Sequence, residues 1–322
     1  MNRNPQAVYD MILDRIPGDV VIERLCLGLT WTWCRAANGI GFAQSPGTVT
    51  RTLDFPGSVA GSRASGVAAW LRSWNPFAAT VGLAAANAVI NAAGNGLLGQ
   101  VALIDGSAPA NLAVFEHFRP CLERSKVVVV GRYPGLDSVL QGLDVTVLER
   151  RPGERDLPDL AADYVIPQAD WVFLTATSLI NKSFPRLAEL AAGAVTVLMG
   201  PSAPWLAEFA DFGIDYLAGV VPVDIECAAT IAAEGGGTRL FGAGVRYAVA
   251  DIGTGALAKL EQDIAETAAR RVALYQAMEA WYTGGNRQRF PGQAELDAVT
   301  GSLSGLDTRY KRQWDARNTR CQ

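Results

Sequence analysis

The sequence predicts an α/β protein: an α+β domain is followed by a Rossmann-like domain with a parallel sheet and by a helical C-terminal extension. Two observations support this class most directly. Four consecutive valines, Val127 to Val130, run into Gly131, and a short helical pattern and a second apolar strand follow, in the order of a βαβ unit. Short apolar runs then alternate with helical segments up to about residue 250, beyond which the periodicity is helical alone.

We expect three parts: an α+β domain over residues 1–110, the Rossmann-like domain over residues 111–250 and the helical extension over residues 251–322. A chain of 322 residues is long enough for two domains of ordinary size. Since 49% of the residues are hydrophobic and 19% are charged, the composition predicts a large core and no extended disorder.

Charge and hydropathy exclude several classes of partner. The formal net charge of −4 gives no basic excess, so a nucleic-acid partner is not expected. No apolar run reaches the ~18 residues of a membrane span. The first residues are polar, without the apolar core of a signal peptide. The sequence thus predicts a cytoplasmic protein that binds neither nucleic acid nor membrane.

Cysteine and histidine are too sparse for the common metal sites. The five cysteines are widely spaced and form no C-x-x-C pair: Cys26, Cys34, Cys121, Cys227 and Cys321. His117 is the only histidine, which excludes most catalytic triads and histidine-based metal sites in one chain. His117 and Cys121 share a helix face but supply only half a site, so we favour a structural or surface role for them.

The N-terminal part begins with an amphipathic helix over residues 5–15, and segments 20–29, 30–34 and 39–42 have strand composition, which predicts an antiparallel meander. A short helix follows over residues 66–71. An alanine-rich helix over residues 77–93 begins after Asn75 and Pro76, which suit its N-cap and first position. Asn87 and Asn91 share one face of it, and we favour bonds to buried backbone groups over a ligand role.

The glycine-rich segment 94–110 is expected to be a linker or a cleft-lining loop, followed by a helix over residues 111–119. After the valine strand, a second strand over residues 145–148 ends at Glu149, about 18 residues beyond Gly131. A dinucleotide-binding βαβ unit places there the acid that receives a ribose. Because segment 131–135 has two glycines where G-x-G-x-x-G needs three, we favour a Rossmann-like sheet without a dinucleotide.

Further strands are expected over residues 164–166, 171–175, 195–199 and 216–221, with helices over residues 203–212 and after Asp224. In the C-terminal extension, the sequence predicts two helices, over residues 256–282 and 294–320. The apolar stripe of the first consists of Leu257, Leu260, Ile264, Ala268, Val272, Tyr275 and Met278. Such a stripe beyond the recognisable domains predicts burial against a partner, most simply a homodimer.

Polar residues follow three of the predicted strands. Thr175, Thr177 and Asn181 follow one strand, Gly200 and Ser202 the next, and Asp224 the third. Because the carboxyl ends of parallel strands meet at one edge of a sheet, we expect these residues to approach a common ligand site. Each hydroxyl could instead be a helix N-cap that contributes about 1 kcal/mol of stability and no chemistry.

These motifs, in this order, resemble a family of proposed heavy-metal chelation proteins, a domain of unknown function. The N-terminal half agrees through the stretch from Gly28 to Trp31 and through Asn75-Pro76. The resemblance covers roughly residues 10–249. It implies an enolase-N-terminal-like domain joined to a Rossmann-like domain, with metal chelation in the cleft between them. Ala176 stands where the family tends to have glycine, and Lys182 where it has a small residue, which favours an anionic ligand.

The candidate ligand-binding residues are therefore Gly131, Glu149, Thr175, Thr177, Asn181, Gly200, Ser202 and Asp224, with Glu149 the candidate metal ligand. The first hypothesis is that the protein binds a metal ion or metal-containing small molecule, a small polar or anionic ligand, and delivers or inserts it. Soft metals would need a ligand that already holds them, given so few cysteines and histidines. One alternative is an enzyme that uses S-adenosylmethionine or NAD, with Glu149 on the ribose. Another is an adaptor that docks a partner protein through its C-terminal helices.

Overall fold

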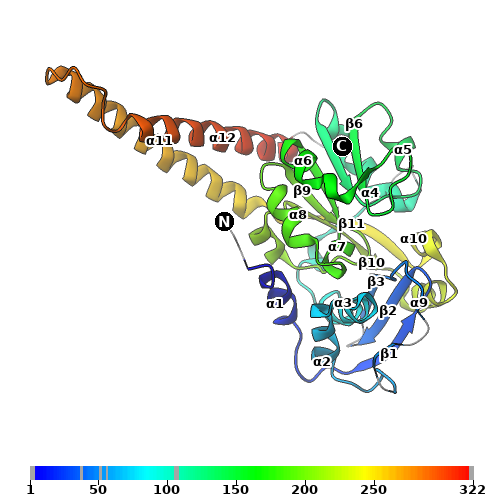
Figure 1. Ribbon diagram of the computed structural model, residues 1–322. Helices are drawn as coiled ribbons and strands as arrows, with labels where there is room; N and C mark the ends of the chain where they lie inside the picture. The colour runs from blue at the N-terminus through cyan, green and yellow to red at the C-terminus, as the bar shows by residue number, and fades with distance from the viewer. Residues whose placement is uncertain (1–3, 37–38, 51–52, 56, 105–108, 319–322) are drawn as a thin grey trace. The chain divides into compact units, whose positions relative to one another are not determined.

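Two sheets organise the first part of the chain (Figure 1). The structure is a computed structural model and describes residues 4–36, 39–50, 53–55, 57–104 and 109–318. The chain divides into two compact units, residues 1–252 and residues 253–320. The first unit holds both sheets and the second holds two helices, so the mixed α/β class predicted from the sequence is confirmed.

The larger sheet has eight strands in the order β4-β11-β10-β9-β8-β5-β6-β7. The parallel strands are β5 (Lys126–Val130), β6 (Asp144–Glu149), β7 (Leu157–Pro158), β8 (Trp171–Thr175), β9 (Val195–Met199) and β10 (Tyr216–Pro222). The valine run forms β5 because parallel strands are covered on both faces, and Val127 and Val129 are at most 1% exposed.

Three strands of this sheet were not predicted from the sequence: β4, β7 and β11. β7 lies in a charged segment with two prolines and a glycine, β11 (Val245–Asp251) pairs antiparallel with β10, and β4 (Ala102–Leu103) pairs antiparallel with β11. The alternation of Val245, Tyr247 and Val249 was the available signal for β11. The sheet is therefore mixed at this end, and part of the expected linker 94–110 contributes an edge strand.

The smaller sheet is the predicted antiparallel meander of β1 (Ile22–Leu27), β2 (Trp31–Ala36) and β3 (Gly39–Gln44). Helix α3 (Pro76–Ile90) packs against β2 and β3, and Asn75 Oδ1 caps it by accepting from the amides of its first turn. Gly41 permits this close packing, because a Cβ there would lie 2.0 Å from the amide nitrogen of Ala88.

A ladder of asparagines ties α3 to the loop after β9. The Nδ2 groups of Asn87, Asn91 and Asn95 donate to carbonyls within residues 202–205 at 3.0, 3.1 and 2.8 Å, respectively. Asn87 is fully buried and also donates to the carbonyl of Phe42 at 2.9 Å. The interpretation of Asn87 and Asn91 as partners of buried backbone groups is confirmed.

The remaining elements of the first unit are short. They are α1 (Ala7–Leu13), α2 (Ala64–Ala68), η1 (Ala69–Arg72), η2 (Leu98–Gln100), η3 (Ala110–Leu112), α4 (Ala113–Leu122), α5 (Leu136–Val139), η4 (Asp159–Ala161), α6 (Ala162–Val165), η5 (Ile166–Gln168), α7 (Thr177–Ile180), α8 (Phe184–Leu190), η6 (Ala207–Phe212), α9 (Ile225–Ala233), η7 (Gly237–Arg239) and α10 (Leu240–Ala243).

Two of the expected elements were wrong. Residues 164–166 are helical rather than a strand, and Pro167 in the first turn of η5 has no amide to donate to a sheet. The helix expected over residues 203–212 is confined to η6, a 3-10 helix. Residues 203–206 are not helical because Pro204 lies among them and the asparagine ladder binds their carbonyls.

The second unit is a hairpin of α11 (Thr254–Thr283) and α12 (Gln293–Asn318), which run side by side in Figure 1. An ion pair between Arg270 and Glu295 joins the two helices. Leu274 is 7% exposed, whereas Val272 and Tyr275 are 51% and 47% exposed, so part of the predicted stripe faces solvent. Within the described residues, no helix combines the length and apolarity that a membrane span requires.

Candidate functional site

The carboxyl ends of β5, β6 and β8 line a cavity of about 1010 Å³ in the first unit. Its opposite wall comes from the smaller sheet and α3, through Trp31, Gln44 and Pro76. This volume is at the upper end of the range for small-molecule sites and is far larger than the space that a bare metal ion needs. Five predicted site residues line it: Gly131, Glu149, Thr175, Thr177 and Asn181.

Gly131 directly follows β5 and has a conformation that glycine adopts readily, with φ at 101°. Its amide donates to the carbonyl of Leu148 at 2.8 Å, which holds the loop against the end of β6. A Cβ at Gly131 would lie 3.3 Å from the Cβ of Thr175. The glycine therefore lets the loop pass close to the hydroxyl-bearing end of β8.

Thr175 and Thr177 belong to a hydrogen-bond chain across the cavity wall. Thr175 Oγ1 donates to Thr177 Oγ1 at 3.1 Å, and Thr177 Oγ1 donates to Gln44 Oε1 at 2.8 Å. The backbone N–H of Gln44 also donates a hydrogen bond to Ser202 Oγ at 2.9 Å. Gln44 thus connects β3 with the loops after β8 and β9, and the sequence reading did not single it out.

Glu149 has backbone partners for both carboxylate oxygens. Oε2 accepts from the amide of Arg132 at 2.8 Å, and Oε1 accepts from the amides of Arg150 at 2.8 Å and Arg151 at 3.4 Å. These bonds fix the loops after β5 and β6 relative to each other. A metal ion or a ribose at Glu149 would have to share oxygens that three amides already use.

Asn181 forms a local turn. Its Oδ1 accepts from the amide of Ser183 at 3.0 Å and from the Ser183 hydroxyl at 2.6 Å, which leaves its Nδ2 group among the donors at the cavity wall. Between these two residues Lys182 has a positive φ of 67°. Its Nζ donates to the carbonyls of Leu71 and Ile180, so this cation stabilises the turn and does not line the cavity.

Gly200, Ser202 and Asp224 do not line the cavity. Ser202 is 2% exposed and its hydroxyl is used by the amide of Gln44. Asp224 caps α9 by accepting from the amide of Cys227 at 2.9 Å. Gly200, with φ at 110°, lies behind the wall, and a Cβ there would be 4.0 Å from the hydroxyl of Tyr133.

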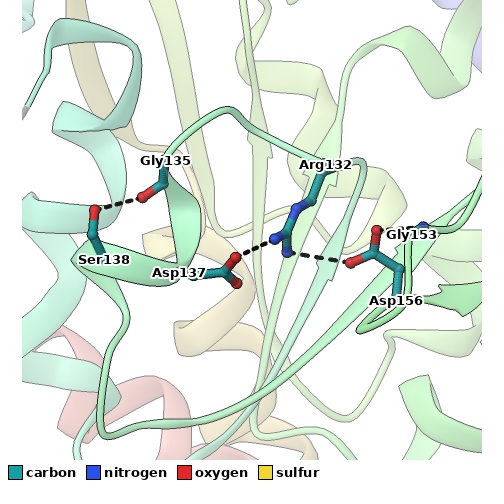
Figure 2. Close-up of polar contacts among 6 residues, drawn as sticks. All are labelled: Arg132, Gly135, Asp137, Ser138, Gly153 and Asp156. Carbon is teal, nitrogen blue, oxygen red and sulfur yellow. Dashed lines mark hydrogen bonds and ion pairs between the residues drawn. The ribbon is translucent and has the colours of Figure 1, made fainter.

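Arg132 forms ion pairs with two aspartates, as Figure 2 shows. Its guanidinium pairs with Asp137 and, at 3.2 Å, with Asp156, whose side chain is 5% exposed. Asp156 also accepts from the amide of Gly153 at 3.0 Å. The loop after β5 is therefore tied to the loop between β6 and β7, and the charge of Arg132 is compensated.

Three further arginines line the cavity. Arg150 pairs with Asp159 at 3.5 Å, and Arg186 pairs with Asp163 and, at 2.9 Å, with Glu189. Within the described part of the chain, the guanidinium of Arg151 has neither an ion pair nor a hydrogen bond. Its Nη1 lies 3.9 Å from the Cβ position of Gly47, across the cavity from the end of β6.

Aromatic side chains line the part of the cavity next to β11. Phe241 stacks on Tyr247 at 5.2 Å between ring centroids, and Trp31 meets Phe241 edge-on at 6.0 Å. Burial raises the pKa of Tyr247 and raises the pKa of Tyr133 to about 12, so both phenols stay protonated at neutral pH. The Tyr133 hydroxyl is buried beside Thr175.

Two family models, both described as "Putative heavy-metal chelation", match this chain. DUF4213 matches residues 9–90, and DUF364 matches residues 113–251. The chain belongs to this heavy-metal chelation family. The resemblance inferred from the sequence motifs is thereby confirmed, and the family description suggests a role in metal chelation.

Solved structures agree with this assignment. A crystal structure of a DUF364 protein of unknown function from Desulfitobacterium hafniense DCB-2 has a TM-score of 0.67 and 28% identity, over 77% of this chain and 98% of its own. Another, from Pyrococcus horikoshii, has a TM-score of 0.61 and 19% identity, over 77% of this chain and 99% of its own, and supports the fold alone. No curated protein matches the chain.

The described residues of this family member do not form a conventional metal centre. Among the described residues, no group of three or more His, Cys, Asp or Glu side chains could hold a metal ion. His117 lies outside the cavity, packs edge-on against Phe118 at 4.9 Å and has its pKa lowered by burial. The cavity is lined by hydroxyls, side-chain amides, aromatic rings, four guanidinium groups and the carboxylates of Glu149, Asp159 and Asp163.

Proposed function

We propose that the protein binds an organic molecule that already holds a metal ion, in the cavity at the carboxyl ends of β5, β6 and β8. The observation that carries the proposal is the contrast between the cavity's size and its chemistry. About 1010 Å³ is lined by aromatic rings, hydrogen-bonding groups and four arginines, which outnumber the three carboxylates, while the described residues offer no cluster of metal ligands. The family description supports the metal, and the lining supports a chelator that brings it.

The polar groups have defined parts in this proposal. Guanidinium groups bind carboxylates and phosphates, and Asn181 Nδ2 donates to further ligand oxygens or nitrogens. Glu149 positions the two loops through its three amide bonds and does not contact the metal. Retention of an intact metal complex suits delivery to an acceptor, because the metal need not leave its chelator while bound.

Copurification tests the proposal. Freshly purified protein is analysed for metals and, after unfolding, for released small molecules by mass spectrometry. We expect metal and one organic species in equal amounts, both reduced in Leu160→Trp, since Leu160 lines the cavity and is 81% exposed. Tyr164→Trp is the matched control, because Tyr164 is 76% exposed outside the lining. Metal without an organic species would contradict the proposal.

A nucleotide-type cofactor, S-adenosylmethionine or NAD, is the second candidate. Gly131 directly follows β5 and Glu149 ends the adjacent parallel strand β6, which is the arrangement that favours it. The partners already on Glu149 count against a ribose at that carboxylate. An adenosine-containing species without metal in the same experiment would favour this candidate, and thermal stabilisation by added NAD or S-adenosylmethionine would support it.

The hairpin of α11 and α12 supports a further proposal, that the protein forms a homodimer or docks a partner through it. Tyr275, Tyr282 and Trp314 are each 46% or 47% exposed on these helices. Half-exposed aromatic side chains are enriched at protein interfaces. Light scattering of the whole chain and of a chain ending before residue 253 distinguishes a dimer formed by the hairpin from a monomer.

A further inference from the structure

We propose that the ligand is amphipathic, with a planar aromatic body at one end of the cavity and an anionic group bound by Arg151 at the other. This inference deepens the proposed function and rests on the same cavity. It makes no use of a metal. It assigns the chemical class of the ligand and names the residue that selects it.

The order of the strands gives the cavity two ends. Tyr247 belongs to β11, whereas Arg150 and Arg151 directly follow β6, and four strands, β10, β9, β8 and β5, lie between β11 and β6 in the sheet. The side chains at the two ends come closer together than the strand order alone suggests, because Trp31 is the register partner of Gln44, and Gly47, whose Cβ position lies 3.9 Å from Arg151 Nη1, is three residues beyond Gln44. A ligand with a flat aromatic body and one charged group can therefore contact both ends.

The β11 end suits a planar ring. Trp31, Phe241 and Tyr247 present aromatic surface there, and their mutual packing holds them in place. The indole of Trp31 is fixed further, because its Nε1 donates to the carbonyl of Gly237 at 2.9 Å. Rigid aromatic walls favour stacking or edge-on contact with a flat, apolar ligand group.

The β6 end suits an anion at one specific residue. Arg132, Arg150 and Arg186 each pair with aspartate, so their charges are compensated by the protein. Arg151 has no such partner among the described residues, and its guanidinium reaches towards Gly47 on the opposite wall. A carboxylate, sulfonate or phosphate can form a bidentate pair with this guanidinium at no cost to an existing ion pair.

The middle of the cavity offers neutral hydrogen-bond donors. Asn181 lines the cavity, and its Nδ2 group can donate to a ligand because its Oδ1 already accepts from Ser183. It follows β8, which lies between β11 and β6 in the sheet. A ligand oxygen or nitrogen beside this amide would add a polar contact between the ring and the anion.

Fluorescent probes test the inference on the full-length protein. The charged probe is 8-anilinonaphthalene-1-sulfonate, and the neutral probe is N-phenyl-1-naphthylamine, which has a similar ring system without the sulfonate. We expect saturable binding of the charged probe. Arg151→Gln should weaken it about tenfold or more, because a hydrogen-bonded charge pair is lost, and should change the affinity for the neutral probe less than about twofold.

The control variant is Arg155→Gln, since Arg155 is an exposed arginine of the same loop that does not line the cavity. It should leave both affinities unchanged. Phe241→Leu should weaken both probes, because both use the aromatic end. Equal effects of Arg151→Gln and Arg155→Gln, or no saturable binding of the charged probe, would overturn the inference. Since neither probe contains a metal, failure of the metal proposal leaves these results unaffected.

Discussion

The Thr177 hydroxyl donates to Gln44 Oε1 at 2.8 Å and so connects the end of β8 with the end of β3. The two residues are 133 positions apart in the chain. The bond joins the two walls of the cavity, one from each sheet. This hydrogen bond therefore helps to hold the two walls at a fixed separation.

Thr177→Val and Gln44→Ala should each lower the free energy of unfolding by about 1 kcal/mol, the usual net value of a partly exposed hydrogen bond. In a double-mutant cycle the two losses should not add, because either change removes the same bond. Urea unfolding measures both. Thr48→Val serves as the control at another hydroxyl of the cavity lining. Fully additive losses would contradict a direct contribution from this bond.

Asn87→Ala should be the most destabilising change in the asparagine ladder. It leaves the carbonyls of Phe42 and Ser202 without their donor in a site that is fully buried. We expect a loss of about 2–4 kcal/mol, measured by urea unfolding, since two buried acceptors lose their partner. Asn286→Ala provides the comparison, because Asn286 is exposed and its loss should cost less than about 1 kcal/mol. Equal costs would contradict the role assigned to the ladder.

Stability should depend on pH through Lys182. Burial lowers the pKa of Lys182 from 10.5 to about 8. Between these values the unfolded chain binds the proton more tightly than the folded protein, so the free energy of unfolding should rise as pH rises from about 8 to 10.5. The difference between wild type and Lys182→Met, measured by urea unfolding at pH 7.5, 9 and 10, should follow this rise. A difference that falls with pH would show that the two carbonyls stabilise the charged form more than burial penalises it.

The strands of the larger sheet were predictable where their side chains are uniformly apolar. The valines of β5 and the apolar runs of β8 and β9 could be recognised as buried strands, because strands covered on both faces carry few polar residues. β11 was missed, because its apolar residues alternate with others and its pairing with β10 is antiparallel. Short apolar runs such as residues 164–166 are ambiguous without their tertiary contacts.

The site was predictable only in part, because strand ends identify a region and not the partners of each side chain. Thr175, Thr177 and Asn181 line the cavity, whereas Ser202 and Asp224 are used by the amides of Gln44 and Cys227. Nothing local in the sequence distinguishes Asp224 from a ligand-binding aspartate. The role of Gln44 follows only from contacts between distant segments, and the lack of an ion pair at Arg151 among the described residues only from the structure around it.

The exposed face of the hairpin leads to a prediction about assembly. If Tyr275 lies in a homodimer interface, Tyr275→Glu should convert the dimer to a monomer by placing an unpaired charge in an apolar contact. Gln276→Glu adds the same charge at the neighbouring exposed position and should leave the dimer intact. Light scattering at high protein concentration measures both. A monomeric wild-type protein would remove the homodimer proposal.

Native mass spectrometry of the freshly purified protein tests the central proposal most directly. The account predicts one mass increment per chain that contains both an organic molecule and a metal, the metal being identified by its isotope pattern. Both should leave together when the protein unfolds. An increment equal to a bare metal ion, an adenosine cofactor without metal, or no increment in any preparation would contradict the proposal that the cavity holds a metal-containing organic molecule.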